Sequence, residues 1–386
     1  MTLLVRNEAD VIEANLDYHL AQGVDFILVT DHGSTDGTRE RLHPYERSGV
    51  VGVIEASDEP HHQSRRVTRM AQLADAEHHA DWVFHNDADE FWWPAAGRLC
   101  DVFAAIPAEF GHITVPRRNF LPGEPGPGPF YSRLLHREAE SLNLIGKQLE
   151  PKVAHRAGPG VVLAPGNHSL TGVDLRSVPD LELLEILHYP MRSFEQFEAK
   201  VIQIGRAYEL LEDRSPGVGR DQLRLLEIQR AGELGRYWEE ALADDVALAR
   251  GIETGTIVLD RRLQTFINSL AEDTPLTPVA AEGRMIRAVV AGALQAVLER
   301  DADHHTLAEV QADRDEVRRD LAHAGNTLAE IQADRDDVRQ ALAHAGSELE
   351  ALRRELAVTT LALDAVRASR VMRWTRRLRR LWYRVR

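Results

Sequence analysis

Three acidic residues, Asp87, Asp89 and Glu90, lie within four positions of one another, directly after an apolar run that begins at Trp82. We predict a buried strand over 82–85, because such a strand delivers the residues that follow it to the carboxyl edge of a sheet, where α/β folds bind ligands. Carboxylates this close repel one another unless a cation lies between them. Asp87 and Asp89 offer the hard oxygen ligands that Mg²⁺ and Mn²⁺ prefer. The pattern is typical of a divalent-metal site, and a solvated acidic turn is the alternative interpretation.

Short strands and helices alternate through the first 90 residues and would position this cluster. We predict strands over 2–5, 26–30, 50–54 and 82–85, and amphipathic helices that include 8–22 and 63–79. This alternation indicates an α/β fold in which helices cover both faces of a parallel sheet.

Polar clusters follow three of the predicted strands, at residues 6–8, 31–38 and 86–90. Right-handed crossovers would bring all three clusters to one edge of the sheet, where a single cleft could reach them. A ligand that is anionic and carries a ring fits this set. Asp31 can accept N–H groups of a base, while Arg6, Arg65 or Arg69 can face phosphates. Neither the dinucleotide fingerprint nor the P-loop motif occurs in the sequence, so dehydrogenase and ATPase functions have no support.

These motifs resemble those of bacterial family 2-type glycosyltransferases that open with a strand followed by Arg-Asn-Glu. The resemblance covers residues 3–10, 19–25, 30–38 and 81–92, in this order, and includes Asp-His-Gly-Ser-Thr-Asp-Gly-Thr and Asp-Ala-Asp-Glu-Phe-Trp. His32 departs from the pattern, since such motifs often carry asparagine there. The resemblance implies a GT-A fold, a Rossmann-like nucleotide-diphospho-sugar transferase fold, and a metal-dependent glycosyltransferase that uses Mn²⁺ or Mg²⁺.

By this resemblance, Asp31 would contact the base, Asp87 would lie near the ribose or the metal, and Asp89 would ligate the metal that bridges the diphosphate. The metal would also take a histidine from the later part of the fold, for which we favour His188 over His168. The residues expected to bind the nucleotide sugar, from the clusters and from two later cations, are Arg6, Asn7, Glu8, Asp31, Gly33, Ser34, Asp36, Arg65, Arg69, Lys152 and Arg192.

Transfer of the sugar leaves negative charge on the diphosphate, and a metal held by Asp89 would stabilise that charge as it develops. If the reaction inverts the anomeric carbon, as we expect, a further carboxylate must remove the proton of the acceptor hydroxyl. The sequence does not choose among the acids that follow the metal motif, and we take Glu150 as the working candidate. The full set is Glu150, Asp174, Asp180, Glu182 and Glu185.

The later part of the chain reads as a Pro/Gly-rich loop over 121–129, followed by helices predicted over 194–211, 221–248 and 283–298. Residues 305–314 recur 21 positions later, and apolar residues keep a heptad spacing to Val366. This pattern indicates a coiled coil that forms a homodimer, with a single exposed helix as the alternative. We therefore divide the chain into a GT-A glycosyltransferase domain (1–200), a helical region (201–300), a coiled coil (301–366) and a basic amphipathic tail (367–386).

Charge is distributed unevenly along the 386 residues, whose net charge is −15. The last 20 residues carry nine arginines and no acid, and tryptophans lie among them. Such a helix is typical of an anchor on anionic lipid, with nucleic-acid binding or partner docking as alternatives for this segment. The acidic remainder excludes nucleic acid as a partner.

We predict a cytoplasmic enzyme on the inner face of the membrane that transfers sugar to a glycan or lipid-linked acceptor in cell-surface polysaccharide synthesis. The single cysteine, Cys100, fits a reducing compartment. A short apolar N-terminus predicts neither a signal peptide nor an anchor. The rival functions are a non-catalytic nucleotide-sugar-binding scaffold that uses the coiled coil, and a metal-dependent nucleotidyltransferase or phosphohydrolase.

Overall fold

The computed structural model describes residues 1–56, 63–142, 147–173, 175–210, 219–271, 280–302 and 317. The chain forms two compact units, residues 1–318 and 319–386. The second unit, which includes the predicted basic tail, lies outside the described residues, as does almost all of the predicted coiled coil. In the ranges that are described, no helix is both long and apolar enough to cross a membrane.

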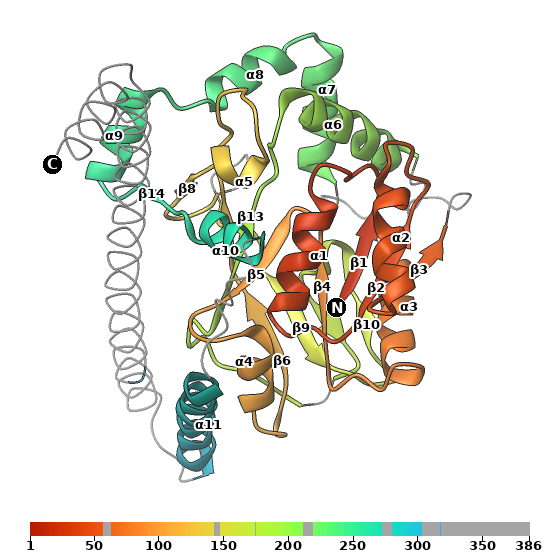
Figure 1. Cartoon of the computed structure of the whole chain (residues 1–386), viewed down its shortest axis with the longest axis vertical. Coiled ribbons are helices and arrows are strands. Elements are labelled where there is room, and N and C mark those ends of the chain that lie inside the picture. Colours follow the sequence, from red (N-terminus) through yellow and green to blue (C-terminus); the bar gives the residue numbers. More distant parts are fainter. Residues whose placement is uncertain are drawn as a thin grey trace, which may run out of the picture. The chain divides into compact units, whose positions relative to one another are not determined.

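The central element is a seven-stranded sheet with the strand order β12-β6-β9-β4-β1-β2-β3 (Figure 1). Its strands are β1 (Thr2–Val5), β2 (Ile27–Asp31), β3 (Val51–Glu55), β4 (Trp82–Asn86), β6 (Phe110–Val115), β9 (Lys152–Arg156) and β12 (Arg176–Ser177). The four strands from the first 90 residues pair in parallel, as the alternating pattern predicts. Beyond them the sheet is mixed, because β9 runs antiparallel to both of its neighbours, β4 and β6.

Helices cover both faces of the parallel half of the sheet. The first helices are α1 (Ile12–Ala21), α2 (Thr38–Ser48), α3 (Gln63–Ala76) and α4 (Leu99–Ala105). Leu3 of β1 packs in one core with Leu16 of α1, whereas its neighbour Leu4 packs in another core with Met70 of α3. Successive strand residues point to opposite faces, so this alternation puts α1 and α3 on opposite sides of the sheet.

A second, three-stranded sheet begins directly at the acidic cluster. It has the order β5-β13-β7 and consists of β5 (Glu90–Pro94), β13 (Leu184–His188) and β7 (Arg117–Asn119). The amide of Glu90 donates to the carbonyl of Asp87 at 3.0 Å, and this tight turn sends the chain from β4 into β5. In the ladder, His188 lies opposite Glu90 on one side and Asn119 on the other.

The described segments after residue 190 are mostly helical. They are α6 (Phe194–Glu209), α7 (Arg220–Arg230), α8 (Leu234–Ala241), α9 (Asp245–Glu253), β14 (Ile257–Leu259), α10 (Arg262–Ala271) and α11 (Ala280–Ala302). The single helix predicted over 221–248 is wrong. Gly232 adopts a positive φ of 75° between α7 and α8, and the Asp244 carboxylate caps α9 by accepting from Ala247 N at 2.7 Å. The sequence-based boundary at residue 200 falls inside α6.

Smaller elements connect these parts. They are α5 (Phe130–Arg133), β8 (His136–Glu138), β10 (Val162–Leu163), the 3₁₀ turn η1 (Pro165–Asn167) and β11 (Leu170–Thr171). β14 pairs antiparallel with β8, so the helical region after residue 201 is joined to the part of the fold before residue 200 by a pair of strands. Residues 121–129, the predicted Pro/Gly-rich loop, form neither helix nor strand.

Candidate active site

The carboxyl ends of β1, β2 and β4 meet at one edge of the large sheet. Val5 lies opposite Asp31 in the ladder, and Leu3 lies opposite Asn86, so the residues after each strand emerge side by side. A cavity of about 990 Å³ opens at this edge. Of the predicted site residues, those that line it are Arg6, Asn7, Glu8, Asp36, Asp87, Glu150, Lys152, His168 and His188. Its opposite wall comes from α6 and from residues 219–222, which the motifs did not include.

The polar residues of the first two clusters hold the loops of this edge together. The Asp31 carboxylate accepts from Ser34 N at 3.0 Å and from Ser34 Oγ at 2.6 Å. Asn7, with a positive φ of 58°, donates its backbone amide to Ser34 Oγ at 3.0 Å. Its side-chain Oδ1 accepts from Thr35 N at 2.8 Å. These bonds fix the two loops against each other at this edge of the sheet.

Asp36 joins the same two loops through its carboxylate. It accepts from Ala9 N at 2.9 Å and from Thr38 Oγ1 at 2.5 Å. Partial burial opposes its ionisation, but the hydrogen bonds from Thr38 and Ala9 outweigh it and lower the pKa of Asp36 below its ordinary value. The carboxylate is therefore charged and committed to the loop structure.

The two aspartates of the acidic cluster point in different directions, and each has its own lysine. Asp87 Oδ2 lies 2.5 Å from Lys152 Nζ on β9, and Asp89 Oδ2 lies 2.5 Å from Lys200 Nζ on α6. Asp87 is partly exposed to the cavity, whereas the Asp89 side chain is 2% exposed. Burial alone would raise the pKa of Asp89, but the charges of Lys200 and Arg192 hold it well below its ordinary value. Asp89 is thus an ionised carboxylate beneath the cavity wall.

Glu90 is fully buried next to these aspartates. Its Oε2 lies 3.4 Å from Lys152 Nζ and its Oε1 lies 3.5 Å from the Arg117 guanidinium. Burial, which Lys152 only partly offsets, raises the pKa of Glu90 to about 7. Among the described residues, Oε1 has no hydrogen-bond partner. The third acid therefore supports the turn from below and does not reach the cavity.

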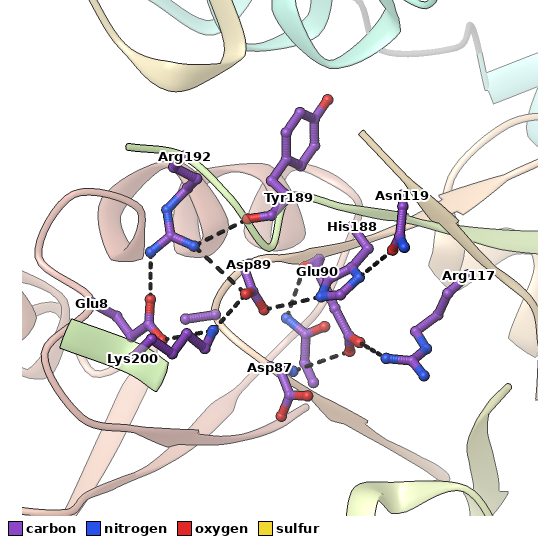
Figure 2. A network of polar contacts seen from close by, with 12 residues as sticks. Glu8, Asp87, Asp89, Glu90, Arg117, Asn119, His188, Tyr189, Arg192 and Lys200 are labelled. Carbon is purple, nitrogen blue, oxygen red and sulfur yellow. Dashed lines mark hydrogen bonds and ion pairs between the residues drawn. The ribbon is translucent and has the colours of Figure 1, made fainter. Parts of the chain in front are cut away.

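His188 presents a lone pair toward Asp89 (Figure 2). Its Nδ1 lies 2.7 Å from Asn119 Oδ1, an acceptor, so Nδ1 carries the proton and donates it. Nε2 faces Asp89 Oδ1 at 3.8 Å. Burial, stronger than the opposing charge of Asp89, lowers the pKa of His188 to about 3, so the imidazole is neutral.

These two atoms form a donor pair suited to a divalent cation. Nε2 of His188 is unprotonated, and Oδ1 of Asp89 is the oxygen that Lys200 and Arg192 leave uncovered, because both cations approach Oδ2. A nitrogen and a carboxylate oxygen are ligands that Mn²⁺ accepts, and the Asn119 bond that orients the ring is the usual support for a metal-binding histidine. Nevertheless, the described part of the chain contains no group of three or more acidic, histidine or cysteine side chains able to hold a metal. Further ligands would have to come from bound substrate or water.

Arg192 lies behind the acids, not in the cavity. Its guanidinium donates to Glu8 Oε2 at 2.6 Å and lies 3.6 Å from Asp89 Oδ2 (Figure 2). It also donates to Asp10 Oδ2 at 2.6 Å. Although burial opposes the charge, these acids raise the pKa of Arg192 above its ordinary value. This position of Arg192 does not suit the expected contact with a diphosphate, because carboxylates already occupy the donors of its planar guanidinium.

His168 and Glu150 form a second pair on the cavity wall. His168 Nδ1 donates to the Pro151 carbonyl at 2.8 Å, and its Nε2 lies 3.5 Å from Glu150 Oε2. Burial, with the charge of Lys152, lowers the pKa of His168 to about 4. The Glu150 side chain is 73% exposed. His168 therefore contacts Glu150 and not the acidic cluster.

The remaining predicted residues lie elsewhere. Arg65 and Arg69 are one helical turn apart on the exposed face of α3, while Arg66 and Met70 are buried, so the expected phosphate contact is not supported by their position. Glu185 forms ion pairs with Arg118 at 3.3 Å and Arg262 at 2.6 Å. Residues that do not line the cavity include Asp31, Gly33, Ser34, Asp180 and Glu182. Asp174 lies outside the described residues.

Lys200 is a site residue that the sequence motifs missed. It lies in the middle of α6, in no recognisable motif, and reaches Asp89 only through the docking of that helix. One signal was present in the composition. The chain contains three lysines, Lys147, Lys152 and Lys200, among 46 lysines and arginines, and two of the three contact the aspartates of the acidic cluster.

Comparison with known proteins gives one family match. Residues 4–106, which include the three strand-end clusters, match the family model of glycosyltransferase family 92. The match supports the resemblance of this part of the chain to glycosyltransferases, and the family 2 assignment stays a prediction. No curated protein matches the chain.

Solved structures give distant likenesses. TarS 1-349 of S. aureus is 13% identical, with 61% of this chain and 88% of that chain covered and a TM-score of 0.32. The same protein in complex with UDP-GlcNAc is 12% identical, with 78% and 91% covered and a TM-score of 0.33. The mannosyltransferase PcManGT from Pyrobaculum calidifontis, in complex with GDP-Man and Mn²⁺, is 17% identical, with 75% and 84% covered and a TM-score of 0.29. Likeness at this level does not by itself establish a shared fold or function.

Proposed function

We propose that the chain is a GT-A glycosyltransferase that moves a sugar from a nucleotide-diphosphate donor to an acceptor hydroxyl. The observation that carries the proposal is the coincidence of two findings. Residues 4–106 match a glycosyltransferase family, and the polar residues of that same stretch border one cavity of about 990 Å³ at the carboxyl edge of the sheet. A cavity of this volume is within the range that holds a ligand of nucleotide-sugar size.

The charges around the cavity fit the leaving group of such a reaction. When the sugar departs, negative charge develops on the diphosphate, and fixed positive groups lower the barrier by stabilising it. Lys152 lines the cavity beside Asp87, and its ammonium, although paired with that carboxylate at 2.5 Å, would add positive potential near a diphosphate. A divalent cation, Mn²⁺ or Mg²⁺, would be held by Asp89 Oδ1 and His188 Nε2 and would add Lewis-acid stabilisation of that charge. Asn119 keeps His188 in the tautomer this role requires.

Glu150 is the proposed general base. Among the candidate bases expected from the sequence and described in the structure, it is the one that lines the cavity, and its side chain is exposed. A carboxylate there can accept the proton of an acceptor hydroxyl that enters from solvent, which an inverting transfer requires.

The wider cellular role rests on parts of the chain outside the described residues. We propose a glycan or lipid-linked acceptor in surface polysaccharide synthesis, homodimerisation through 301–366, and attachment to the inner face of the membrane through 367–386. The composition of these segments supports the dimer and the membrane attachment, and an enzyme that acts on a lipid-linked or surface glycan would gain from such an anchor.

Calorimetry with Mn²⁺ and a panel of UDP- and GDP-sugars tests the function. We expect one donor to bind, to bind more tightly with Mn²⁺, and to lose that dependence on Mn²⁺ in Asp89→Asn. Asp245→Asn is the matched control, because Asp245 is exposed at the start of α9 and does not line the cavity. Failure of every donor to bind would contradict the proposal. Product analysis separates the rivals, since a transferase releases nucleoside diphosphate, a phosphohydrolase releases inorganic phosphate or nucleoside monophosphate, and a scaffold releases nothing.

A further inference from the structure

Lys200 places a positive charge at the point where two buried acids converge. Its Nζ lies 2.5 Å from Asp89 Oδ2 and 3.2 Å from Glu8 Oε1 (Figure 2). Burial would lower the pKa of Lys200, but Asp89 and Glu8 raise it above its ordinary value. The ammonium of Lys200 is therefore the counter-ion of Asp89. A divalent cation bound at His188 would need that same carboxylate as a ligand.

We propose that Lys200 is an internal competitor of the divalent cation, which binds well only when a diphosphate draws Lys200 away from Asp89. This inference rests on the proposed function and adds a coupling between its two ligands. In the ligand-free enzyme, Lys200 then neutralises the charge of Asp89. The metal and the nucleotide diphosphate therefore bind cooperatively.

The balance of charge supports this competition. The charged network around Asp89 contains five acids, Glu8, Asp10, Asp87, Asp89 and Glu90, and four cations, Arg117, Lys152, Arg192 and Lys200. A divalent ion that enters alone meets acids that are already nearly neutralised and two positive side chains around Asp89. Such like charges repel strongly at short range in a site with little water. A diphosphate that enters with the metal supplies the missing negative charge.

The two cations at Asp89 differ in their freedom to move. Arg192 is 1% exposed and bound by several acceptors in the fork geometry of its guanidinium, so it is a fixed charge. The Lys200 side chain is 27% exposed and lies on the cavity wall, next to Ala199 and one turn from Gln196 and Gln203, which also line the cavity. An ammonium on a flexible stem can swing from Asp89 to a phosphate in the cavity without moving α6.

Mn²⁺ binding, followed by the paramagnetic resonance of the free ion, tests the competition without any turnover. Lys200→Met keeps most of the apolar stem and removes the charge, so we expect it to bind Mn²⁺ alone at least about tenfold more tightly than wild type. In wild type, UDP or GDP should tighten Mn²⁺ binding at least about tenfold, and in Lys200→Met this gain should largely vanish. Lys147→Met is the matched control, since Lys147 is exposed and does not line the cavity, and it should behave as wild type.

An Mn²⁺ affinity of Lys200→Met equal to or weaker than that of wild type would overturn the inference, as would the absence of Mn²⁺ binding by both proteins. Lys200→Gln serves the same purpose if the methionine variant does not fold. The nucleotide dependence of Mn²⁺ binding in wild type provides a measurement that needs no variant. Binding of the donor sugar nucleotide, measured without metal, tests the proposed function separately. A protein that binds the donor but shows no competition between Lys200 and Mn²⁺ would be a transferase without this coupling.

Discussion

Asn119 accepts the Nδ1 proton of His188 at 2.7 Å and so turns the Nε2 lone pair of that histidine toward Asp89. The two residues are neighbours in the ladder between β7 and β13, which makes the orientation of the ring a property of the sheet. Loss of such a supporting bond typically lowers metal affinity 10- to 100-fold.

We expect Asn119→Leu to weaken Mn²⁺ binding in the presence of nucleotide diphosphate by about 10- to 100-fold, with little change in nucleotide binding without metal. Calorimetry measures both quantities. Asn268→Leu, at an exposed position of α10, is the matched control. Unchanged Mn²⁺ affinity in Asn119→Leu would show that His188 does not depend on this bond.

Asn15 on α1 supports the acidic turn from the other side. Its Nδ2 donates to the carbonyls of Ala88 and Glu90 at 2.9 and 2.8 Å, and the residue is fully buried. Asn15→Leu would leave the Ala88 carbonyl without this donor, whereas the Glu90 carbonyl keeps a hydrogen bond from Asn86 Nδ2 at 3.1 Å. Each buried group that stays unsatisfied costs about 1–3 kcal/mol. We expect urea denaturation to show a loss of at least about 2 kcal/mol. Gln72→Leu, an exposed polar residue of α3, should change stability by less than about 0.5 kcal/mol.

The part of the site that comes from the first 90 residues was predictable. Each of β1 to β4 is a short apolar run next to turn-forming residues, and the predicted bounds differ from the observed ones by no more than a residue at either end. Parallel strands joined by right-handed crossovers all end at one edge of the sheet. The order of strands and helices along the chain therefore predicts that Arg6, Asp31 and Asp87 lie at the same edge.

The rest of the site depends on contacts between distant segments that no local pattern records. The pairing of β7 with β13 brings Asn119 to His188, and the docking of α6 brings Lys200 to Asp89. Arg192 resembles an ordinary surface cation in the sequence, yet Glu8 and Asp10 bury it by pairing with it. For Lys200, the sequence offered one signal of a special role: lysine is rare in this chain, and almost all of its other basic residues are arginines.

The contact between α6 and α7 holds Lys200 in place, and Gly205 makes that contact close. A methyl group on Gly205 would lie 2.6 Å from Cβ of the buried Leu226. Alanine normally favours a helix over glycine by about 1 kcal/mol. Here overpacking should dominate, and we expect Gly205→Ala to lower the free energy of unfolding by about 1–3 kcal/mol, measured in urea. Gly235→Ala on α8 is the opposite control, because its methyl group meets nothing within 4 Å and should stabilise.

The buried, neutral His19 should make the stability of the fold depend on pH. It is fully buried; Nδ1 donates to the Asn15 carbonyl at 2.8 Å, and Nε2 accepts from Trp92 N at 3.3 Å, so a second proton has no place. Burial lowers its pKa from 6.5 to about 3. Between these values the unfolded chain binds a proton at this histidine that the native protein does not, so acidification destabilises the fold by up to about 1.4 kcal/mol per pH unit. We expect His19→Gln, although less stable at pH 7, to show a flatter decline from pH 6.5 to 4 in urea titrations. The exposed His43→Gln should decline as wild type does, and equal slopes for all three proteins would contradict the prediction.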